Sequence, residues 1–205
     1  MARADALWTP LGDRAIRFSR PAGASPRAIV QAARAWPGVI DVVVAAHDVA
    51  VYFDGPPVIN DAQLRALASA PDAPEPGREL TLVAIYDGPD LDAIAAAARL
   101  SISDVISLYA GATYVVDTLG FAPGFAYLTG LDARLHLPRR ATPRARVPGG
   151  SLAIAGGYTA VYPFDSPGGW HLLGRVAISA GSPLFGSAGA LLQLGDRVRF
   201  VRSAP

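Results

Sequence analysis

The chain has 205 residues, of which 51% are hydrophobic and only 17% charged, a balance typical of a folded protein with a substantial core. All 18 basic residues are arginine and cysteine is absent, which excludes a lysine Schiff base, a self-contained P-loop, a thiolate nucleophile and sulfur ligands for a metal. The net charge of +1 provides no general attraction for nucleic acid. The N-terminus has no secretory h-region, and no run approaches the ~18 apolar residues of a membrane span. We therefore expect a cytoplasmic, bacterial protein that binds neither nucleic acid nor membrane.

The first part of the chain predicts a small α/β unit. Asp13–Phe18 is expected to form a strand, and 26–36 a helix with Ser25 as its N-cap and a proline at its first position. Val39–Val44 and Val49–Phe53 predict two more strands joined by a short turn, because apolar residues alternate along the second of them. A further helix is expected after a cap at Asn60.

Residues 71–77 form the clearest linker, since four of the seven are proline or glycine. We therefore expect an N-terminal α/β domain over residues 1–79 and a second domain over residues 80–205. The second domain is predicted to open with a strand at Leu80–Tyr86, followed by a helix at Leu91–Leu100 with Asp90 as its cap and a short helix at Ser103–Leu108. Short apolar runs separated by Gly and Pro then continue to Arg197–Val201 and indicate a barrel or a sandwich.

Two segments after residue 119 concentrate unusual residues. Gly120–Leu128 combines glycine, proline and aromatic residues; it is either a turn between strands or a rigid loop whose aromatic side chains line a pocket and whose amides bind an anion. Residues 134–146 carry five arginines on a proline-stiffened stretch, which is either a solvated loop or a clamp for carboxylate or phosphate.

Ser166–Trp170 predicts a tight turn before a strand, with backbone amides that either complete the turn or point into a site. Asp165, Ser166 and His171 have the residue types of a hydrolase triad, but no nucleophile elbow surrounds Ser166, so we do not assign one. Arg175 is either a structural arginine paired with Asp165 or Asp196, or a residue that faces substrate. The remaining histidines are isolated, and no metal site is expected.

Taken in order, these segments resemble the KipI / PxpB / allophanate hydrolase subunit 1 family, which includes the B component of 5-oxoprolinase. The resemblance extends from a weak N-terminal match at 11–14 to the last predicted strand, and therefore covers nearly the whole chain. The segments that carry it best are Gly120–Leu128, Pro138-Arg139, Pro143-Arg144, Val147-Pro148 with Ser151, Ile154–Gly156, Tyr162-Pro163 and Ser166–Arg175.

The resemblance implies an α+β fold in which a small N-terminal α/β sandwich domain precedes a cyclophilin-like β-barrel domain. It also implies a subunit that acts with a homologous cyclophilin-like subunit (PxpC or KipA type) and a LamB/YcsF-type subunit, which together convert 5-oxo-L-proline, ATP and water to L-glutamate. ATP, with Mg, is expected to be held with a partner subunit, and the single chain is expected to be inactive alone. The alternatives are a KipI-like inhibitor of a sensor histidine kinase, or a carboxyltransferase/allophanate hydrolase subunit 1 of urea degradation.

An ATP-dependent opening of a lactam needs cations for phosphate charge and for the substrate carboxylate. The sequence offers no identifiable catalytic residue, so the predicted site consists of binding groups. The residues expected to bind substrate or anion are Arg139, Arg144, Arg175, Gly124, Gly168 and Gly169, and those expected to wall the pocket are Phe121, Phe125, Tyr127, Tyr162 and Trp170.

Overall fold

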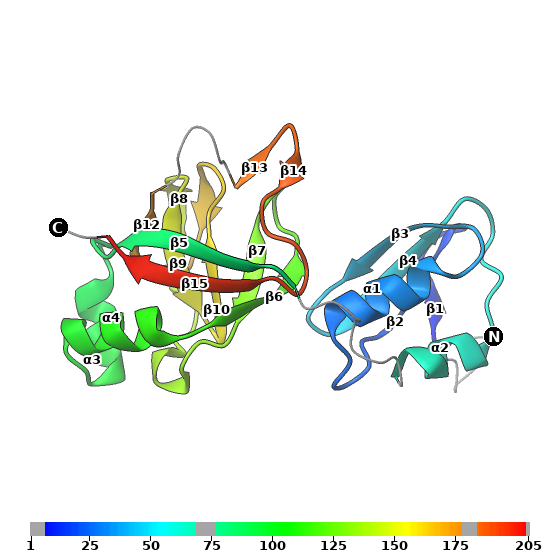
Figure 1. Ribbon diagram of the computed structural model, residues 1–205, viewed down its shortest axis with the longest axis horizontal. Helices are drawn as coiled ribbons and strands as arrows, with labels where there is room; N and C mark the ends of the chain where they lie inside the picture. Colours follow the sequence, from blue (N-terminus) through cyan, green and yellow to red (C-terminus); the bar gives the residue numbers. More distant parts are fainter. Residues whose placement is uncertain (1–6, 69–76, 178–183, 204–205) are drawn as a thin grey trace. The chain divides into compact units, whose positions relative to one another are not determined.

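The computed structural model (Figure 1) describes residues 7–68, 77–177 and 184–203, and the chain divides into two compact units, Met1–Pro76 and Gly77–Pro205. The division falls close to the expected boundary after Glu79, although the assignment of two domains stays a prediction. Most of the predicted linker lies outside the described residues. Each unit has its own buried apolar cluster, and each is described separately below.

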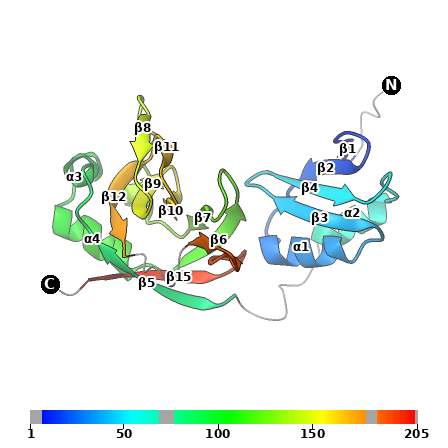
Figure 2. The ribbon, with the colours of Figure 1, turned by 90° about the horizontal axis from the view of Figure 1, so that it is seen from above.

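The N-terminal unit is built on a four-stranded antiparallel sheet with the order β1-β2-β4-β3, one face of which is covered by two helices (Figure 2). Alternating buried residues of β2 and β4 face these helices, where Ile16, Ile29 and Val51 are fully buried. The elements are β1 (Thr9–Pro10), β2 (Ala15–Ser19), α1 (Pro26–Arg34), β3 (Val39–Val44), β4 (Asp48–Phe53) and α2 (Asp61–Ala68).

The helix ends of this unit follow local capping chemistry. The Ser25 hydroxyl accepts a hydrogen bond from the Ala28 amide at 3.2 Å, as its position predicts, and Asn60 accepts one from Gln63 at 3.0 Å. Helix α1 ends at Arg34 rather than at Trp36, because the amides of Ala35 and Trp36 bond to carbonyls three residues back instead of four.

The second unit is a closed seven-stranded barrel with the order β10-β7-β6-β15-β5-β12-β9, which confirms the predicted α+β class and decides between barrel and sandwich in favour of the barrel. Strands β5 and β15 pair in parallel from Glu79↔Arg197 to Ala84↔Arg202, while the other neighbours are antiparallel. The barrel strands are β5 (Glu79–Ile85), β6 (Tyr114–Leu119), β7 (Ala126–Thr129), β9 (Ser151–Ala155), β10 (Tyr158–Val161), β12 (His171–Val176) and β15 (Arg197–Arg202).

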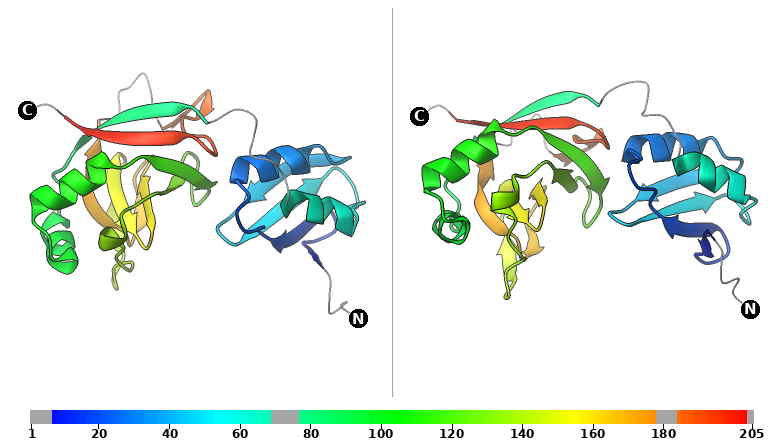
Figure 3. Two further views of the ribbon diagram at one scale, coloured as in Figure 1. Left: turned by 60° about the horizontal axis from the view of Figure 1, so that its bottom comes forward. Right: turned by 90° about the horizontal axis from the view of Figure 1, so that it is seen from below.

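Two helices lie together at one end of the barrel, and two short strand pairs project from it (Figure 3). The second helix is longer than the expected 103–108, because Ser101 and Asp104 form a capping box that starts it at Ile102. The remaining elements are α3 (Leu91–Ala98), α4 (Ile102–Gly111), η1 (Ala133–Leu135), the pair β8 (Arg144–Val147) and β11 (Ser166–Gly168), and the pair β13 (Phe185–Gly186) and β14 (Gly189–Ala190).

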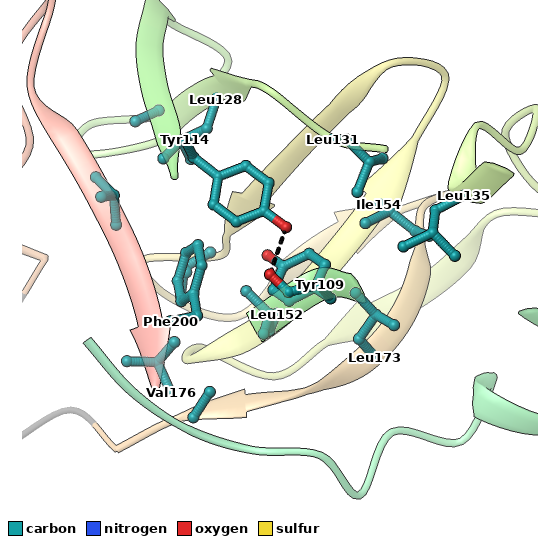
Figure 4. Close-up of a cluster of buried hydrophobic side chains, with 14 of the residues drawn as sticks. Tyr109, Tyr114, Leu128, Leu131, Leu135, Leu152, Ile154, Leu173, Val176 and Phe200 are labelled. Atoms are coloured by element: carbon teal, nitrogen blue, oxygen red, sulfur yellow. Dashed lines mark hydrogen bonds between the residues drawn. The ribbon is translucent and has the colours of Figure 1, made fainter. Parts of the chain in front are cut away.

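The barrel interior contains a short polar chain within its apolar core. The Tyr109 hydroxyl bonds to that of Thr159. The Tyr114 hydroxyl donates to the Tyr109 carbonyl at 2.8 Å (Figure 4). All three residues are fully buried, and burial raises the pKa of both tyrosines well above the usual range. Because these hydroxyls have partners, the tyrosines fill the core without leaving unsatisfied polar groups.

Candidate functional site

A small pocket of about 60 Å³ lies at one edge of the barrel and brings together eight of the eleven predicted site residues. A larger hollow of about 410 Å³ in the N-terminal unit is lined mainly by small residues and prolines, and offers no comparable convergence of aromatic and charged groups. The lining of the small pocket comes from four segments of the chain and consists of Phe121, Phe125, Tyr127, Arg139, Tyr162, Pro167, Gly168, Gly169 and Trp170.

The aromatic wall is centred on Phe125, which is buried and contacts four other rings edge-to-face. The ring centroids of Phe121, Tyr127 and Tyr162 lie 5.1, 5.0 and 5.3 Å from that of Phe125. Trp170 lies 5.8 Å from Phe125 and 5.7 Å from Tyr127. Edge-to-face contacts of this kind add stability beyond area burial, so the wall is a rigid surface.

The loop between β6 and β7 positions Phe121 at the pocket rim. Backbone bonds from Gly120 to the Phe125 carbonyl and from Phe125 to the Ala122 carbonyl close the loop into a tight turn. The turn holds Phe121 at φ 71°, a left-handed conformation that is unfavourable for a bulky residue, and leaves its side chain 61% exposed. The segment is therefore a turn that also presents aromatic side chains to the pocket, while anion binding by its amides stays a prediction.

Gly124 and Gly168 permit close backbone approaches at two different places. Gly168 lies in the pocket against the Tyr162 hydroxyl. Gly124 has φ +79°, and a β-carbon there would lie 2.6 Å from the β-carbon of Phe185, so this glycine packs against the start of β13 and does not line the pocket. Gly169 lines the pocket, while its carbonyl accepts a bond from the Arg140 amide at 2.8 Å.

Arg139 is the arginine of the predicted clamp that reaches the pocket. Its positive charge acts on the hydroxyls of Tyr127 and Tyr162: burial raises the pKa of both, and Arg139 opposes that rise. The Tyr162 hydroxyl also accepts a hydrogen bond from the backbone of Trp170. The pocket therefore combines one guanidinium with two neutral tyrosine hydroxyls, both of which belong to the aromatic wall.

Arg144 and Arg175 do not join Arg139 in the pocket lining, so the expected convergence of three arginines is not observed. Arg144 donates to the Asp90 carboxylate at 2.7 Å, and its side chain is only 23% exposed. Arg175 donates to Asp87 at 3.0 Å on the surface, rather than to either of its expected partners.

Asp90 has a different role from the one predicted from the sequence. It was expected to cap α3, yet its side chain makes no cap bond and accepts instead from Arg140 at 3.0 Å, from Arg144 at 2.7 Å and from the Leu172 amide at 2.7 Å. Burial acts to raise its pKa, but the bonds from Arg144 and Leu172 and the charge of Arg140 lower it below the usual range. Asp90 is 4% exposed, and through Arg140 and Arg144 it fixes residues 134–146, called the arginine segment below, to the barrel.

The hydrolase triad that we declined to assign does not form. Asp165 accepts from Arg146 and from the Gly149 amide, and His171 bonds through Nε2 to the Pro138 carbonyl at 3.0 Å. Within the described ranges, no group of three or more His, Asp or Glu side chains is placed to hold a metal ion. Among the same residues no single helix is long and apolar enough to cross a membrane; α3 and α4 meet that test only as a pair bent by 90°.

Comparison with known proteins identifies the class and then the family. The model of the carboxyltransferase domain, subdomain C and D, matches residues 7–185 and defines a carboxyltransferase-domain protein. The B component of 5-oxoprolinase from Bacillus subtilis (strain 168) is 35% identical, covering 94% of this chain and 90% of the relative, and that from Escherichia coli O157:H7 is 40% identical, covering 80% and 78%. The chain belongs to the family of 5-oxoprolinase B components, as its motifs indicated.

Solved structures share the fold of this chain. TTHA0988 has 35% identity and a TM-score of 0.76 over 94% of this chain, which spans only 41% of the TTHA0988 chain. PH0987 from Pyrococcus horikoshii has 28% identity and a TM-score of 0.56, with 96% and 97% of the two chains covered. Kluyveromyces lactis urea carboxylase has 20% identity and a TM-score of 0.67 over 22% of its chain, which is a likeness of fold alone.

Proposed function

We propose that this chain is the B component of an ATP-dependent 5-oxoprolinase, which opens 5-oxo-L-proline to L-glutamate. The observation that carries the proposal is 34–40% identity to three 5-oxoprolinase B components, over 80–94% of this chain. We further propose a cytoplasmic complex with a homologous cyclophilin-like subunit and a LamB/YcsF-type subunit, and a cyclophilin-like shape for the barrel of this chain.

The described residues suit the binding of a small anion better than the binding of a nucleotide. A pocket of about 60 Å³ is far below the ~300–1,000 Å³ of sites that bury drug-sized ligands. The chain has no lysine for the phosphates, and among the residues that the structure describes no carboxylate lines the pocket to hold Mg. We therefore place ATP on the partner subunits and assign to this chain the binding and orientation of substrate and the exclusion of water by the aromatic wall.

Co-expression tests this function directly. The chain should be produced with the two presumed partner subunits, and glutamate release from 5-oxoproline should be measured with and without ATP. We expect ATP-dependent release by the three-subunit complex and none by the single chain. Complex formation without any ATP-dependent opening of 5-oxoproline would contradict the proposal, as would turnover by the chain alone.

A second candidate is a KipI-like inhibitor that docks on a sensor histidine kinase. It is favoured by the exposure of Phe121 and Phe185, which are 61% and 46% exposed. A pull-down that recovers a kinase instead of the partner subunits would replace the first proposal with this one. The urea-degradation alternative is favoured by the match to the carboxyltransferase-domain model and by the fold likeness to urea carboxylase.

A further inference from the structure

The arginine segment provides one cation that is not already neutralised. Of its five guanidinium groups, four are paired with carboxylates: Arg134 with Asp132, Arg140 and Arg144 with Asp90, and Arg146 with Asp165. Arg139 has no carboxylate or hydrogen-bond partner among the described residues, and it is the member of the set that lines the pocket. An unpaired arginine in a segment where every other arginine is paired is available to a ligand.

The backbone on both sides of Arg139 is fixed. The carbonyl of Pro138 is bonded to His171 Nε2 at 3.0 Å. The amide of Arg140 donates to the Gly169 carbonyl at 2.8 Å, and its guanidinium donates to Asp90 at 3.0 Å. These bonds attach the residues before and after Arg139 to the barrel, so its Cα is held in place and less conformational entropy is lost when a ligand binds.

The groups around Arg139 define the chemistry of that ligand. A guanidinium can donate two parallel hydrogen bonds to a carboxylate, and the neutral hydroxyls of Tyr127 and Tyr162 can donate further ones. A single cation balances a monoanion, whereas the several charges of a polyphosphate would remain largely uncompensated against the aromatic wall. The volume of about 60 Å³ leaves room for a carboxylate with a few attached atoms and none for a nucleoside.

We infer that the Arg139 pocket is the subsite for the carboxylate of a small monocarboxylate substrate and that the nucleotide never enters it. Under the proposed function, on which this inference rests, the ligand is the carboxylate of 5-oxo-L-proline. The lactam then extends past Phe121 toward the pocket mouth. Arg139 is the recognition residue, and Asp90 holds the neighbouring Arg140.

The test uses the full chain labelled with ¹⁵N and follows the Trp170 indole resonance during titration. The probes are 5-oxo-L-proline, 2-pyrrolidinone (the same lactam without the carboxylate), inorganic phosphate and ATP. The variants are Arg139→Gln, Arg139→Lys and, as a control with equal loss of charge, Arg199→Gln on the exposed face of β15.

We expect saturable shifts with 5-oxo-L-proline only, affinity at least ~10-fold weaker in Arg139→Gln, an intermediate affinity in Arg139→Lys, and a change below ~2-fold in Arg199→Gln. The inference is overturned if the wild-type chain does not respond to 5-oxo-L-proline, if 2-pyrrolidinone, phosphate or ATP binds as well, or if Arg139→Gln binds like wild type.

Kinetics of the reconstituted complex separate this inference from the proposed function. Arg139→Gln should raise the KM for 5-oxo-L-proline at least ~10-fold and leave the KM for ATP unchanged. An active complex with an unchanged KM in this variant keeps the function and overturns the subsite. A chain that binds 5-oxo-L-proline through Arg139, in a complex that never opens it, keeps the subsite and overturns the function.

Discussion

Gly168 packs against Tyr162 so closely that a β-carbon at Gly168 would lie 2.2 Å from the Tyr162 hydroxyl oxygen and 2.9 Å from the ring carbon that carries it. Tyr162 is 2% exposed and its hydroxyl is bonded to the Trp170 backbone, so the ring has little freedom to withdraw. The pocket therefore needs glycine at residue 168 to keep this hydroxyl in place.

Gly168→Ala should displace Tyr162 and lower the free energy of unfolding by about 1–3 kcal/mol, measured by urea denaturation. Gly169→Ala is the matched control, since its β-carbon would meet its nearest neighbour at an ordinary 3.6 Å, and we expect a change within about 0.5 kcal/mol. Adding Tyr162→Phe to Gly168→Ala should recover part of the loss. Equal effects of the two glycine substitutions would contradict this account.

Removal of the Asp90 carboxylate should destabilise the barrel through its arginine partners. We expect Asp90→Ala to lower the free energy of unfolding by about 3 kcal/mol, because Arg140, Arg144 and the Leu172 amide all lose their acceptor. Asp90→Asn should cost less, since its amide oxygen still accepts from Leu172. Asp92→Asn, at an exposed position on α3, serves as the control and should change stability by less than about 0.5 kcal/mol.

The contribution of the Asp90 carboxylate to the free energy of unfolding should decrease as the pH falls. Its folded pKa is lowered below the unfolded value of about 3.9, so the unfolded chain takes up the proton first as the pH falls. The difference in stability between wild type and Asp90→Asn should therefore be full above about pH 4 and shrink at lower pH. A difference that grows on acidification would refute the assignment.

At position 121, a glycine variant should be more stable than an alanine variant, which is the reverse of the usual order. In most positions glycine is the less stabilising residue by about 0.5–1 kcal/mol, but only glycine is at ease at the φ of 71° found here. We expect Phe121→Gly to be more stable than Phe121→Ala by about 1 kcal/mol in thermal or urea unfolding. Phe164, also exposed but without a positive φ, should show the ordinary order, with alanine above glycine.

Tyr86 should ionise late and make the barrel sensitive to alkali. Burial raises its pKa to about 12, with Arg202 opposing the rise, whereas an unfolded tyrosine ionises near 10. Its contribution to stability is therefore complete below about pH 10 and is lost as the pH rises toward 12. The ultraviolet difference titration between wild type and Tyr86→Phe should show this step; a step near pH 10 would contradict it.

Local chemistry was predictable from the sequence, and long-range pairing was not. The cap at Ser25 and the aromatic loop at Gly120–Leu128 were recognised because their causes lie within a few residues. Arg144 and Asp90 are 54 residues apart, and no spacing rule selects that carboxylate from the other acidic residues. The same limit applies to Arg175, whose partner Asp87 lies 88 residues away. The pocket lining was identified largely because its motifs resembled a family, whereas the pairing state of each arginine required coordinates.

The parallel pairing of β15 with β5 has a consequence during biosynthesis. Strand β5 is synthesised well before its parallel partner β15, because Arg197 pairs with Glu79 but lies far downstream in the chain. Until β15 is made, one edge of β5 and one edge of β6 have no pairing strand, and unpaired edges of this kind favour aggregation. Closure of the barrel therefore waits for β15, which makes it a late step of folding.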